Sequence, residues 1–199
     1  MNVLLIRHGQ TDWNCQNKIQ GWSDVDLNNK GISEINDLCK FIKKGYWDYV
    51  ITSDLTRAKQ TAKYIANKNN MQYNLDKRLC ERKLGNIEDL AKFMNDKETR
   101  DPSREQLAFP DFKTRDGESA NETNKRMNEF INEILEKYNG ERIVVISHGG
   151  SIKFYLLSYC KVNNNLNLEY KEKELNITSP CLLKLTFRGK ELLNIEKIQ

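Results

Sequence analysis

The chain has 199 residues, of which 38% are hydrophobic and 30% are charged, and its formal net charge at pH 7 is +4. This length suits one domain around one sizeable core, and the composition excludes a disordered chain. No apolar run approaches the roughly 20 residues that cross a bilayer, and the N-terminus lacks the pattern of a secretory signal peptide. We therefore expect a single-domain cytoplasmic protein over residues 1–199, with no membrane partner.

The cysteines and the charge pattern argue against a metal-binding, a disulfide-rich and a nucleic-acid-binding protein. The five cysteines are scattered without a C-x-x-C pair, and the chain has only two histidines, so we expect neither a zinc site nor a disulfide framework. The modest positive charge forms no long basic run, which argues against a nucleic-acid partner and suits a small anionic ligand. The pattern does not define an oligomeric state.

Apolar runs and helical patterns alternate along the first half of the chain. The short runs at 3–6 and 49–52 have the length of buried strands. Apolar residues then recur at helical spacing from Ile32 to Ile42, with Gly45 placed to end that helix. A further helix is predicted by the apolar positions Leu55, Ala58, Ala62 and Ile65.

The segment from about 95 to 116 interrupts this alternation. It is charged and carries two of the three prolines, Pro102 and Pro110. Two interpretations stay open, a cap over a site that would extend over about 86–116 and a solvated surface excursion.

A further helix follows this segment. It should begin at a capping box, Ser119-x-x-Glu122, and stop at Asn139-Gly140. Its apolar positions run from Met127 to Tyr138 at helical spacing.

The C-terminal part predicts a strand, a helix and a hairpin. The strand covers 143–146, and the helix covers about 151–159 before an Asn-rich loop at 163–167. Alternating apolar residues at 183–187 and a second apolar run at 192–198 flank a glycine turn, which indicates the hairpin. We therefore predict an α/β fold, a three-layer α/β/α sandwich with a mainly parallel central sheet and an antiparallel edge strand.

Two of the predicted strands end in the same way. Residues 3–9 read VLLIRHG and residues 143–149 read IVVISHG, so His8 and His148 each follow an apolar run and precede a glycine. Ligands of open α/β sheets bind outside the carboxyl ends of the strands, so we expect both histidines at one site there. A metal site competes with this interpretation, but no carboxylate stands at a ligand spacing from either histidine.

Two arginines belong to the same pattern. Arg7 precedes His8, and Arg57 lies in the first turn of the helix after strand 49–52. A cation there opposes the positive end of the helix dipole, so its position needs another reason. A bound phosphate supplies one, because guanidinium groups match phosphate oxygens in charge and geometry. For the neighbouring Asp54 we prefer a helix-capping role.

Five blocks, in order, resemble the histidine phosphatase superfamily, the phosphoglycerate mutase-like family. They are Arg7-His8-Gly9-Gln10-Thr11 with Asn14, SDLTRAKQTA at 53–62, Leu79-Cys80-Glu81-Arg82 with Gly85, Gly117-Glu118-Ser119, and Ser147-His148-Gly149-Gly150. The stretch from Gln20-Gly21 to Gly31 also resembles the substrate-side loop of the family. The resemblance implies a phosphoglycerate mutase-like fold and phosphoryl transfer through a phosphohistidine, with no metal and no cofactor.

The resemblance also implies roles for nine residues. His8 would be the nucleophile, with its other ring nitrogen held by a backbone acceptor. Glu81 would protonate the leaving oxygen, although alone it suggests a surface carboxylate paired with Arg82. Glu118 is a weaker rival for this role and fits better as support for the following helix. The cationic groups around the phosphoryl group would be Arg7, Arg57 and His148. The groups that bind phosphate or substrate would be Asn14, Gln20, Gly21 and Gly149.

The chain departs from the family pattern in two places. Ile87-Glu88-Asp89 stands where relatives often carry Trp-Glu-Gly, and Gln10 stands where many carry glutamate. The segment 86–112 would line the leaving-group side of the site, with Arg100, Arg104 and Arg115 as candidate contacts.

The choice between hydrolysis and isomerisation depends on one insert. Mutases of the family carry a longer, proline-rich insert before the Gly-Glu-Ser block and an extended tail, whereas here only residues 84–116 intervene. We therefore predict a metal-independent phosphomonoesterase for a small phosphorylated metabolite, such as a ribazole phosphate, a sugar phosphate or a phosphoglycerate. The alternatives are a 2,3-bisphosphoglycerate-dependent phosphoglycerate mutase and a non-catalytic phospholigand-binding module.

Overall fold

A computed structural model of the chain describes residues 1–85, 107, 109–165 and 167–199. Most of the expected cap at about 86–116 therefore lies outside the described residues. The same holds for Ile87-Glu88-Asp89 and for the candidate contacts Arg100 and Arg104.

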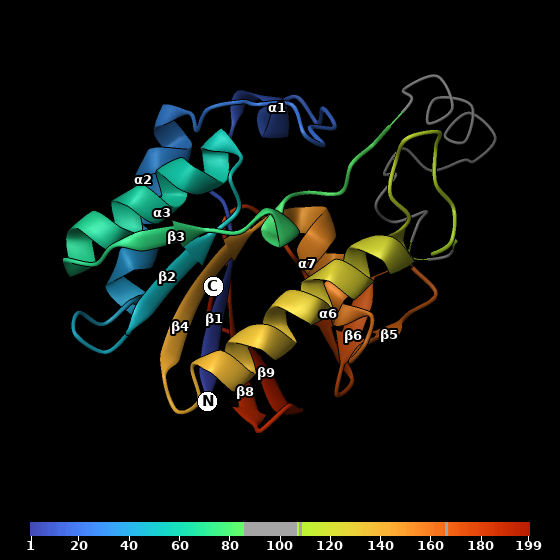
Figure 1. Ribbon diagram of the computed structural model, residues 1–199. Coiled ribbons are helices and arrows are strands. Elements are labelled where there is room, and N and C mark those ends of the chain that lie inside the picture. Colours follow the sequence, from blue (N-terminus) through green and yellow to red (C-terminus); the bar gives the residue numbers. More distant parts are fainter. Residues whose placement is uncertain (86–106, 108, 166) are drawn as a thin grey trace.

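A six-stranded sheet forms the centre of the molecule (Figure 1). Its strands are β1 (Asn2–Arg7), β2 (Tyr49–Thr52), β3 (Tyr73–Leu75), β4 (Arg142–Ser147), β8 (Cys181–Arg188) and β9 (Glu191–Lys197). The order across the sheet is β3-β2-β4-β1-β8-β9. The first four strands are mutually parallel, and β8 pairs antiparallel with both β1 and β9. The prediction of a mainly parallel sheet with an antiparallel edge is confirmed.

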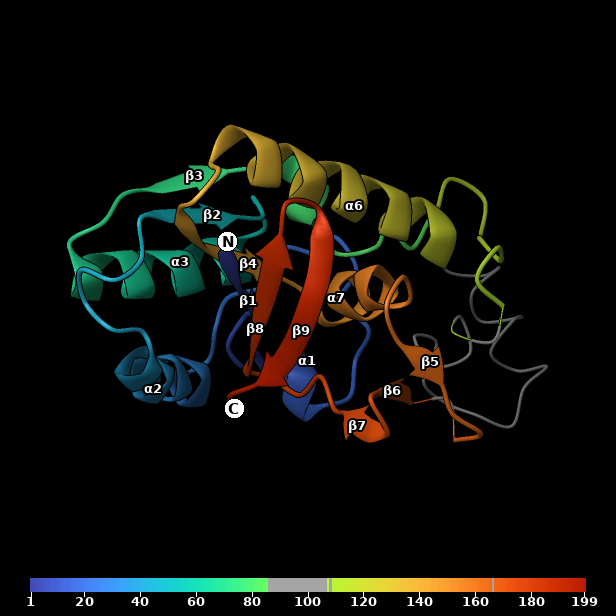
Figure 2. The same cartoon turned by 90° about the horizontal axis from the view of Figure 1, so that it is seen from below.

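Helices cover both faces of this sheet (Figures 1 and 2). One layer holds α2 (Asn29–Leu38) and α3 (Thr56–Asn69), and the other holds α6 (Ala120–Lys137) and α7 (Gly149–Leu156). Side chains alternate between the two layers along each strand. In β1, Leu4 and Ile6 pack in the α2–α3 core, whereas Val3 and Leu5 pack in the α6–α7 core. Burial on both faces explains why β1 and β4 are continuous apolar runs.

Short elements complete the fold. A separate antiparallel sheet contains β5 (Lys161–Val162), β6 (Leu168–Tyr170) and β7 (Lys173–Leu175), with the expected Asn-rich loop between β5 and β6. The remaining elements are α1 (Asp12–Cys15), η1 (Cys39–Phe41) and η2 (Lys77–Leu79). In the part of the chain that the structure describes, no helix is both long and apolar enough to span a bilayer.

Two helices end earlier than the sequence predicts. The prediction that Gly45 ends α2 is wrong, because the helix stops at Leu38, tightens into η1 and becomes extended at Ile42. Helix α7 begins at Gly149 and ends at Leu156 instead of covering about 151–159. The capping box of α6 is confirmed, since Ser119 and Glu122 exchange both hydrogen bonds.

Candidate active site

The two histidines lie side by side because β1 and β4 end in register. Arg7 pairs with Ser147, so His8 and His148 follow at the same edge of the sheet. The His8 amide donates to the Ser147 carbonyl over 3.1 Å. The two imidazole rings are 5.1 Å apart between centroids, and both histidines are buried. Strand β2 ends beside β4 and adds Ser53 to this edge.

The contacts of His8 define its tautomer. Its Nδ1 lies 2.7 Å from the Gly9 carbonyl oxygen. A carbonyl oxygen only accepts, so Nδ1 carries the hydrogen and Nε2 keeps its lone pair in the neutral ring. Arg57 Nε lies 3.2 Å from Nε2 and donates to it. The ring is thereby held with its basic nitrogen toward the guanidinium of Arg57.

Arg57 is fully buried in the first turn of α3, and each end of its guanidinium is fixed. Its Nη1 donates to the Ser23 carbonyl and its Nη2 to the Gly21 carbonyl, both over 2.8 Å. Gly21 has a φ of +47°, a backbone conformation that favours glycine. Arg7 is held in a similar way, because its Nη1 donates to the Ile177 carbonyl over 2.8 Å.

The cap of α3 is not the predicted one. Asp24 Oδ1 accepts from the Thr56 amide over 2.7 Å, and its Oδ2 accepts from the Thr56 hydroxyl over 2.8 Å. The prediction that Asp54 caps this helix is wrong, because Leu55 occupies the N-cap and Asp54 precedes it. The Asp54 carboxylate instead accepts from Cys80 Sγ over 2.8 Å.

One ring nitrogen of His148 has a hydrogen-bond partner, and the other has none among the described residues. Its Nε2 lies 2.8 Å from Ser53 Oγ, which also accepts from the Leu55 amide over 3.2 Å. Its Nδ1 is buried and has no hydrogen-bond partner among the residues that the structure describes. Buried polar atoms normally have a partner, so this nitrogen is an exception in the site.

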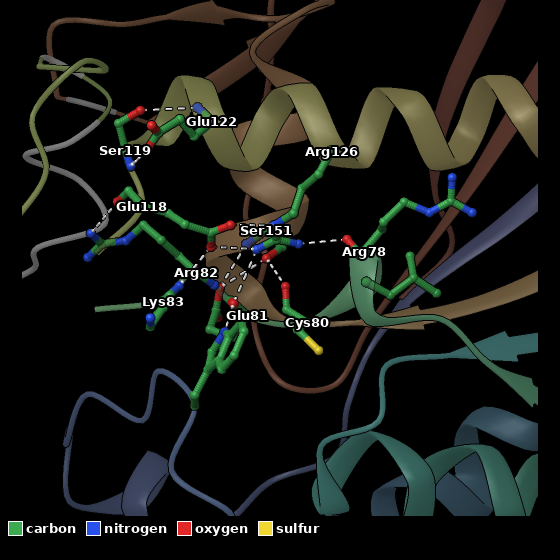
Figure 3. A network of polar contacts seen from close by, with 12 residues as sticks. Arg78, Cys80, Glu81, Arg82, Lys83, Glu118, Ser119, Glu122, Arg126 and Ser151 are labelled. Atoms are coloured by element: carbon green, nitrogen blue, oxygen red, sulfur yellow. Dashed lines mark hydrogen bonds and ion pairs between the residues drawn. The ribbon is translucent and has the colours of Figure 1, made fainter. Parts of the chain in front are cut away.

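Glu81 binds the first turn of α7 (Figure 3). Its Oε1 accepts from the Arg82 and Ser151 amides over 2.8 and 2.9 Å, and its Oε2 accepts from the Gly150 amide over 3.0 Å. A Cβ at position 150 would lie 2.6 Å from Glu81 Oε1, so glycine is needed for this approach. The alternative of a surface pair with the Arg82 side chain is wrong, because the contact is with the Arg82 backbone.

The Glu118 carboxylate binds the Arg126 side chain and the backbone near Glu81 (Figure 3). Its two carboxylate oxygens accept from Arg126 Nε and Nη2 over 2.8 and 3.0 Å. It also accepts from the Lys83 amide over 2.8 Å. Glu118 therefore ties α6 to the segment that carries Glu81.

A cavity of about 880 Å³ opens at this edge of the sheet and brings eight of the nine predicted residues together. These eight are Arg7, His8, Asn14, Gln20, Gly21, Arg57, Glu81 and Gly149. The ninth, His148, lies beside His8 and is not part of the lining.

Three of the predicted binding residues have distinct surroundings. Asn14 uses its Oδ1 to accept from Thr11, and its Nδ2 has no partner among the described residues. Gln20 Oε1 is buried and has no hydrogen-bond partner among the described residues. Gly149 lies against Arg7, and a Cβ there would be 3.1 Å from the Arg7 guanidinium carbon. The site thus offers one amide donor and one amide acceptor beside its cations.

Sequence reasoning missed several residues of the site. Ser53 could have been found, because it ends a third parallel strand just as His8 and His148 end theirs. Ile177 and Ser179 could not, because they precede β8, whose antiparallel pairing brings its start to this edge. Ser179 donates to the His8 carbonyl over 2.8 Å.

Burial and neighbouring charge keep both histidines neutral. Burial, followed by the charge of Arg57, holds the pKa of His8 well below its usual value of 6.5. The same two causes, in the same order, hold the pKa of His148 well below 6.5. Burial also lowers the pKa of Arg57. At neutral pH the site therefore contains two neutral imidazoles beside two arginines.

These shifts predict that the free energy of unfolding falls as the pH drops below about 6.5. Unfolded histidines take up protons there and the buried ones do not, so each contributes a slope of up to about 1.4 kcal/mol per pH unit. Urea titrations at several pH values between about 5 and 7 measure this slope. The variant His148→Gln should have the shallower slope, and equal slopes in the two proteins would contradict the prediction.

Comparisons with known proteins identify the family of this chain. The sequence profile described as histidine phosphatase superfamily (branch 1) matches residues 3–194. The chain is 31% identical over 192 residues to the "probable phosphoglycerate mutase GpmB" of Cronobacter sakazakii, covering 94% of this chain and 86% of that protein.

Solved structures share the fold over nearly the whole chain. A mycobacterial glucosyl-3-phosphoglycerate phosphatase in complex with VO3 superposes with a TM-score of 0.77 at 20% identity, covering 100% of this chain and 97% of that one. A mutant phosphoserine phosphatase from Entamoeba histolytica, in complex with phosphoserine, gives a TM-score of 0.72 at 25% identity, covering 98% and 95%. With a profile match over residues 3–194, this chain belongs to the histidine phosphatase superfamily, branch 1.

Proposed function

We propose that the protein is a phosphomonoesterase that hydrolyses a small phosphorylated metabolite through a covalent phosphohistidine. One observation carries the proposal: His8 is buried at a strand end, with Nδ1 bound to the Gly9 carbonyl and Nε2 beside Arg57 in the cavity. A neutral imidazole in one fixed tautomer is a ready nucleophile at neutral pH.

In the first step, the substrate phosphate binds between Arg7 and Arg57. Arg57 Nε, which donates to His8 Nε2 in the free protein, transfers its hydrogen bond to a phosphate oxygen. Nε2 then attacks phosphorus as the bond to the leaving oxygen breaks. Glu81 supplies the proton that this oxygen needs, because an alkoxide is a poor leaving group.

The equatorial oxygens find donors around the cavity. Arg7 and Arg57 match their charge, and Asn14 offers its unpartnered Nδ2. His148 lies beside His8 rather than in the lining, and we assign to its unsatisfied Nδ1 a supporting role when it carries the proton there. The arginines supply the positive charge in this scheme, which assigns no role to a metal or a cofactor.

In the second step, water replaces the alcohol. Glu81 accepts a proton from the water as its oxygen attacks phosphorus, the P–N bond breaks, and His8 returns to its neutral form with inorganic phosphate released. Each proton that Glu81 gives in the first step is thereby recovered in the second.

A cofactor-dependent mutase is the second candidate, because the Cronobacter sakazakii relative, at 31% identity, is named a probable phosphoglycerate mutase. The test compares phosphate release from 3-phosphoglycerate with its isomerisation in the presence of 2,3-bisphosphoglycerate and a chelator. We expect phosphate release to be the faster reaction. Faster isomerisation would favour the mutase, and neither reaction across a panel of phosphomonoesters would favour a non-catalytic module.

A further inference from the structure

We infer that Trp22 is a positioning residue for the proposed reaction, and that it acts together with Arg126 by holding the backbone carbonyl of Glu81. The inference rests on the proposed phosphatase function, in which Glu81 protonates the leaving oxygen. Neither Trp22 nor Arg126 belongs to the described lining of the cavity, so each acts through Glu81 and not on the substrate itself.

The backbone that carries Glu81 is held by side chains instead of by a sheet or a helix. Residues 80–85 belong to no helix and to no strand. The four successive carbonyls at positions 78–81 each accept a hydrogen bond from a side chain of another segment. The donors are Arg126 to Arg78, Ser147 to Leu79, Ser151 to Cys80, and both Trp22 and Arg126 to Glu81. These side chains therefore determine where the Glu81 carboxyl group is placed.

Trp22 joins the proton donor to the part of the site that binds phosphate. Its Nε1 donates to the Glu81 carbonyl over 2.6 Å. The residues before and after it, Gly21 and Ser23, use their own carbonyls to hold the Arg57 guanidinium, each over 2.8 Å. One stretch of three residues thus contacts both the buried arginine and the backbone of the acid.

The hydrogen bond, more than burial, explains a tryptophan at position 22. The residue is 48% exposed, so its ring gains less from burial than a core aromatic side chain does. Lys83 Nζ lies 5.9 Å from the centroid of the ring. An indole has a single N–H donor, and here that donor is on the Glu81 carbonyl. This donor is the group that phenylalanine would lack.

Arg126 supplies the second donor to the same carbonyl. Its Nη2 donates to the Glu81 carbonyl over 3.2 Å, and its Nη1 donates to the Arg78 carbonyl over 2.6 Å. The Glu118 carboxylate holds the Arg126 guanidinium in place (Figure 3). A carbonyl oxygen has two lone pairs, so Trp22 and Arg126 together satisfy it. The carbonyl is thereby fixed both from α6 and from the loop that contains Trp22.

Glu81 is consequently held at both of its ends. The amides of Arg82, Gly150 and Ser151 bind its carboxylate, and Trp22 and Arg126 bind its carbonyl. A general acid must lie within hydrogen-bond reach of the leaving oxygen, and a displacement of about 1 Å can lower the rate about 10²-fold. A looser Glu81 backbone should therefore slow proton transfer more than it weakens phosphate binding.

The variant Trp22→Phe tests this, because it keeps an aromatic ring and removes the N–H donor. We expect kcat for glycerol 3-phosphate to fall about tenfold and kcat for p-nitrophenyl phosphate to change less than about twofold, because nitrophenolate leaves without a proton. KM for both esters should stay near the wild-type value, since the Arg57 guanidinium is held by backbone carbonyls. The matched control Lys83→Gln changes the surroundings of the same ring and should leave both rates unchanged.

Urea transitions check that each variant folds. If Trp22→Phe does not fold, Arg126→Lys replaces it, because lysine keeps the charge but lacks the planar fork that reaches the Arg78 and Glu81 carbonyls. The same selective loss is expected. Equal slowing of both esters, or no slowing of either, would overturn the positioning role and leave the phosphatase function standing. No phosphate release from either ester by the wild-type protein would overturn the proposed function itself.

Discussion

Replacing His8 with alanine is expected to stop phosphate release, with a fall in kcat of about 10⁴-fold or more. The variant lacks the nitrogen that forms the bond to phosphorus, while Arg7 and Arg57 still bind the phosphate. Steady-state phosphate release from an alkyl phosphate measures the loss. A variant that retained a tenth of the wild-type rate would rule out the covalent mechanism.

The chain offers an unambiguous way to locate the intermediate, because His8 and His148 are its only histidines. Wild-type protein mixed with ³²P-labelled substrate and quenched in base should retain label that acid removes, as a phosphohistidine does. His8→Ala should retain none. His148→Gln, the matched control, should turn over more slowly yet still take up label, since His8 lines the cavity and His148 does not. Label on His8→Ala would move the nucleophile to another residue.

The removal of a buried ring also tests the fold. His8 is 2% exposed, so the alanine variant contains a polar gap beside Arg57. We expect lower stability but a cooperative urea transition, because β1 is held by backbone pairing with β4 and β8. A folded, inactive variant separates lost chemistry from lost structure.

The strand ends explain why much of the site could be predicted from sequence. Strands buried on both faces are continuous apolar runs, so VLLI and IVVI stand out without an alignment. Parallel neighbours in register present their next residues at one edge, which is why two similar stretches more than a hundred residues apart converge at His8 and His148. The apolar runs and the rule that ligands bind at the carboxyl ends of parallel strands are enough to predict that the two histidines meet.

The unpredicted features depend on contacts between distant segments. Asp24 caps a helix that begins 32 residues later, whereas the adjacent Asp54 does not, and only the loop path decides between them. Arg82 donates to the Glu118 carbonyl, and the Glu118 carboxylate binds Arg126 from helix α6. The strands of the β5-β6-β7 sheet are two or three residues long, too short for alternation to be visible.

Replacing Glu81 with glutamine is expected to slow the hydrolysis of an alkyl phosphate by about 10²–10⁴-fold. The effect on p-nitrophenyl phosphate should be far smaller, because nitrophenolate departs without a proton. Rates of phosphate release from glycerol 3-phosphate and from p-nitrophenyl phosphate, each relative to wild type, measure the difference. Glu81 is the one carboxylate in the described lining, so no second acid of that kind replaces it there.

The alternative explanation is structural, because the Glu81 carboxylate also accepts from the Gly150 and Ser151 amides at the start of α7. Glutamine would present an NH₂ group to one of those donors, at a cost of about 1–3 kcal/mol in stability. Ser151→Ala is the matched control, since it removes a hydroxyl that contacts Glu81 Oε1 and keeps the acid. Loosening of α7 alone would slow both esters equally in both variants. If Glu81 is the proton donor, Glu81→Gln should slow the hydrolysis of glycerol 3-phosphate far more than that of p-nitrophenyl phosphate, because only the first leaving group needs a proton.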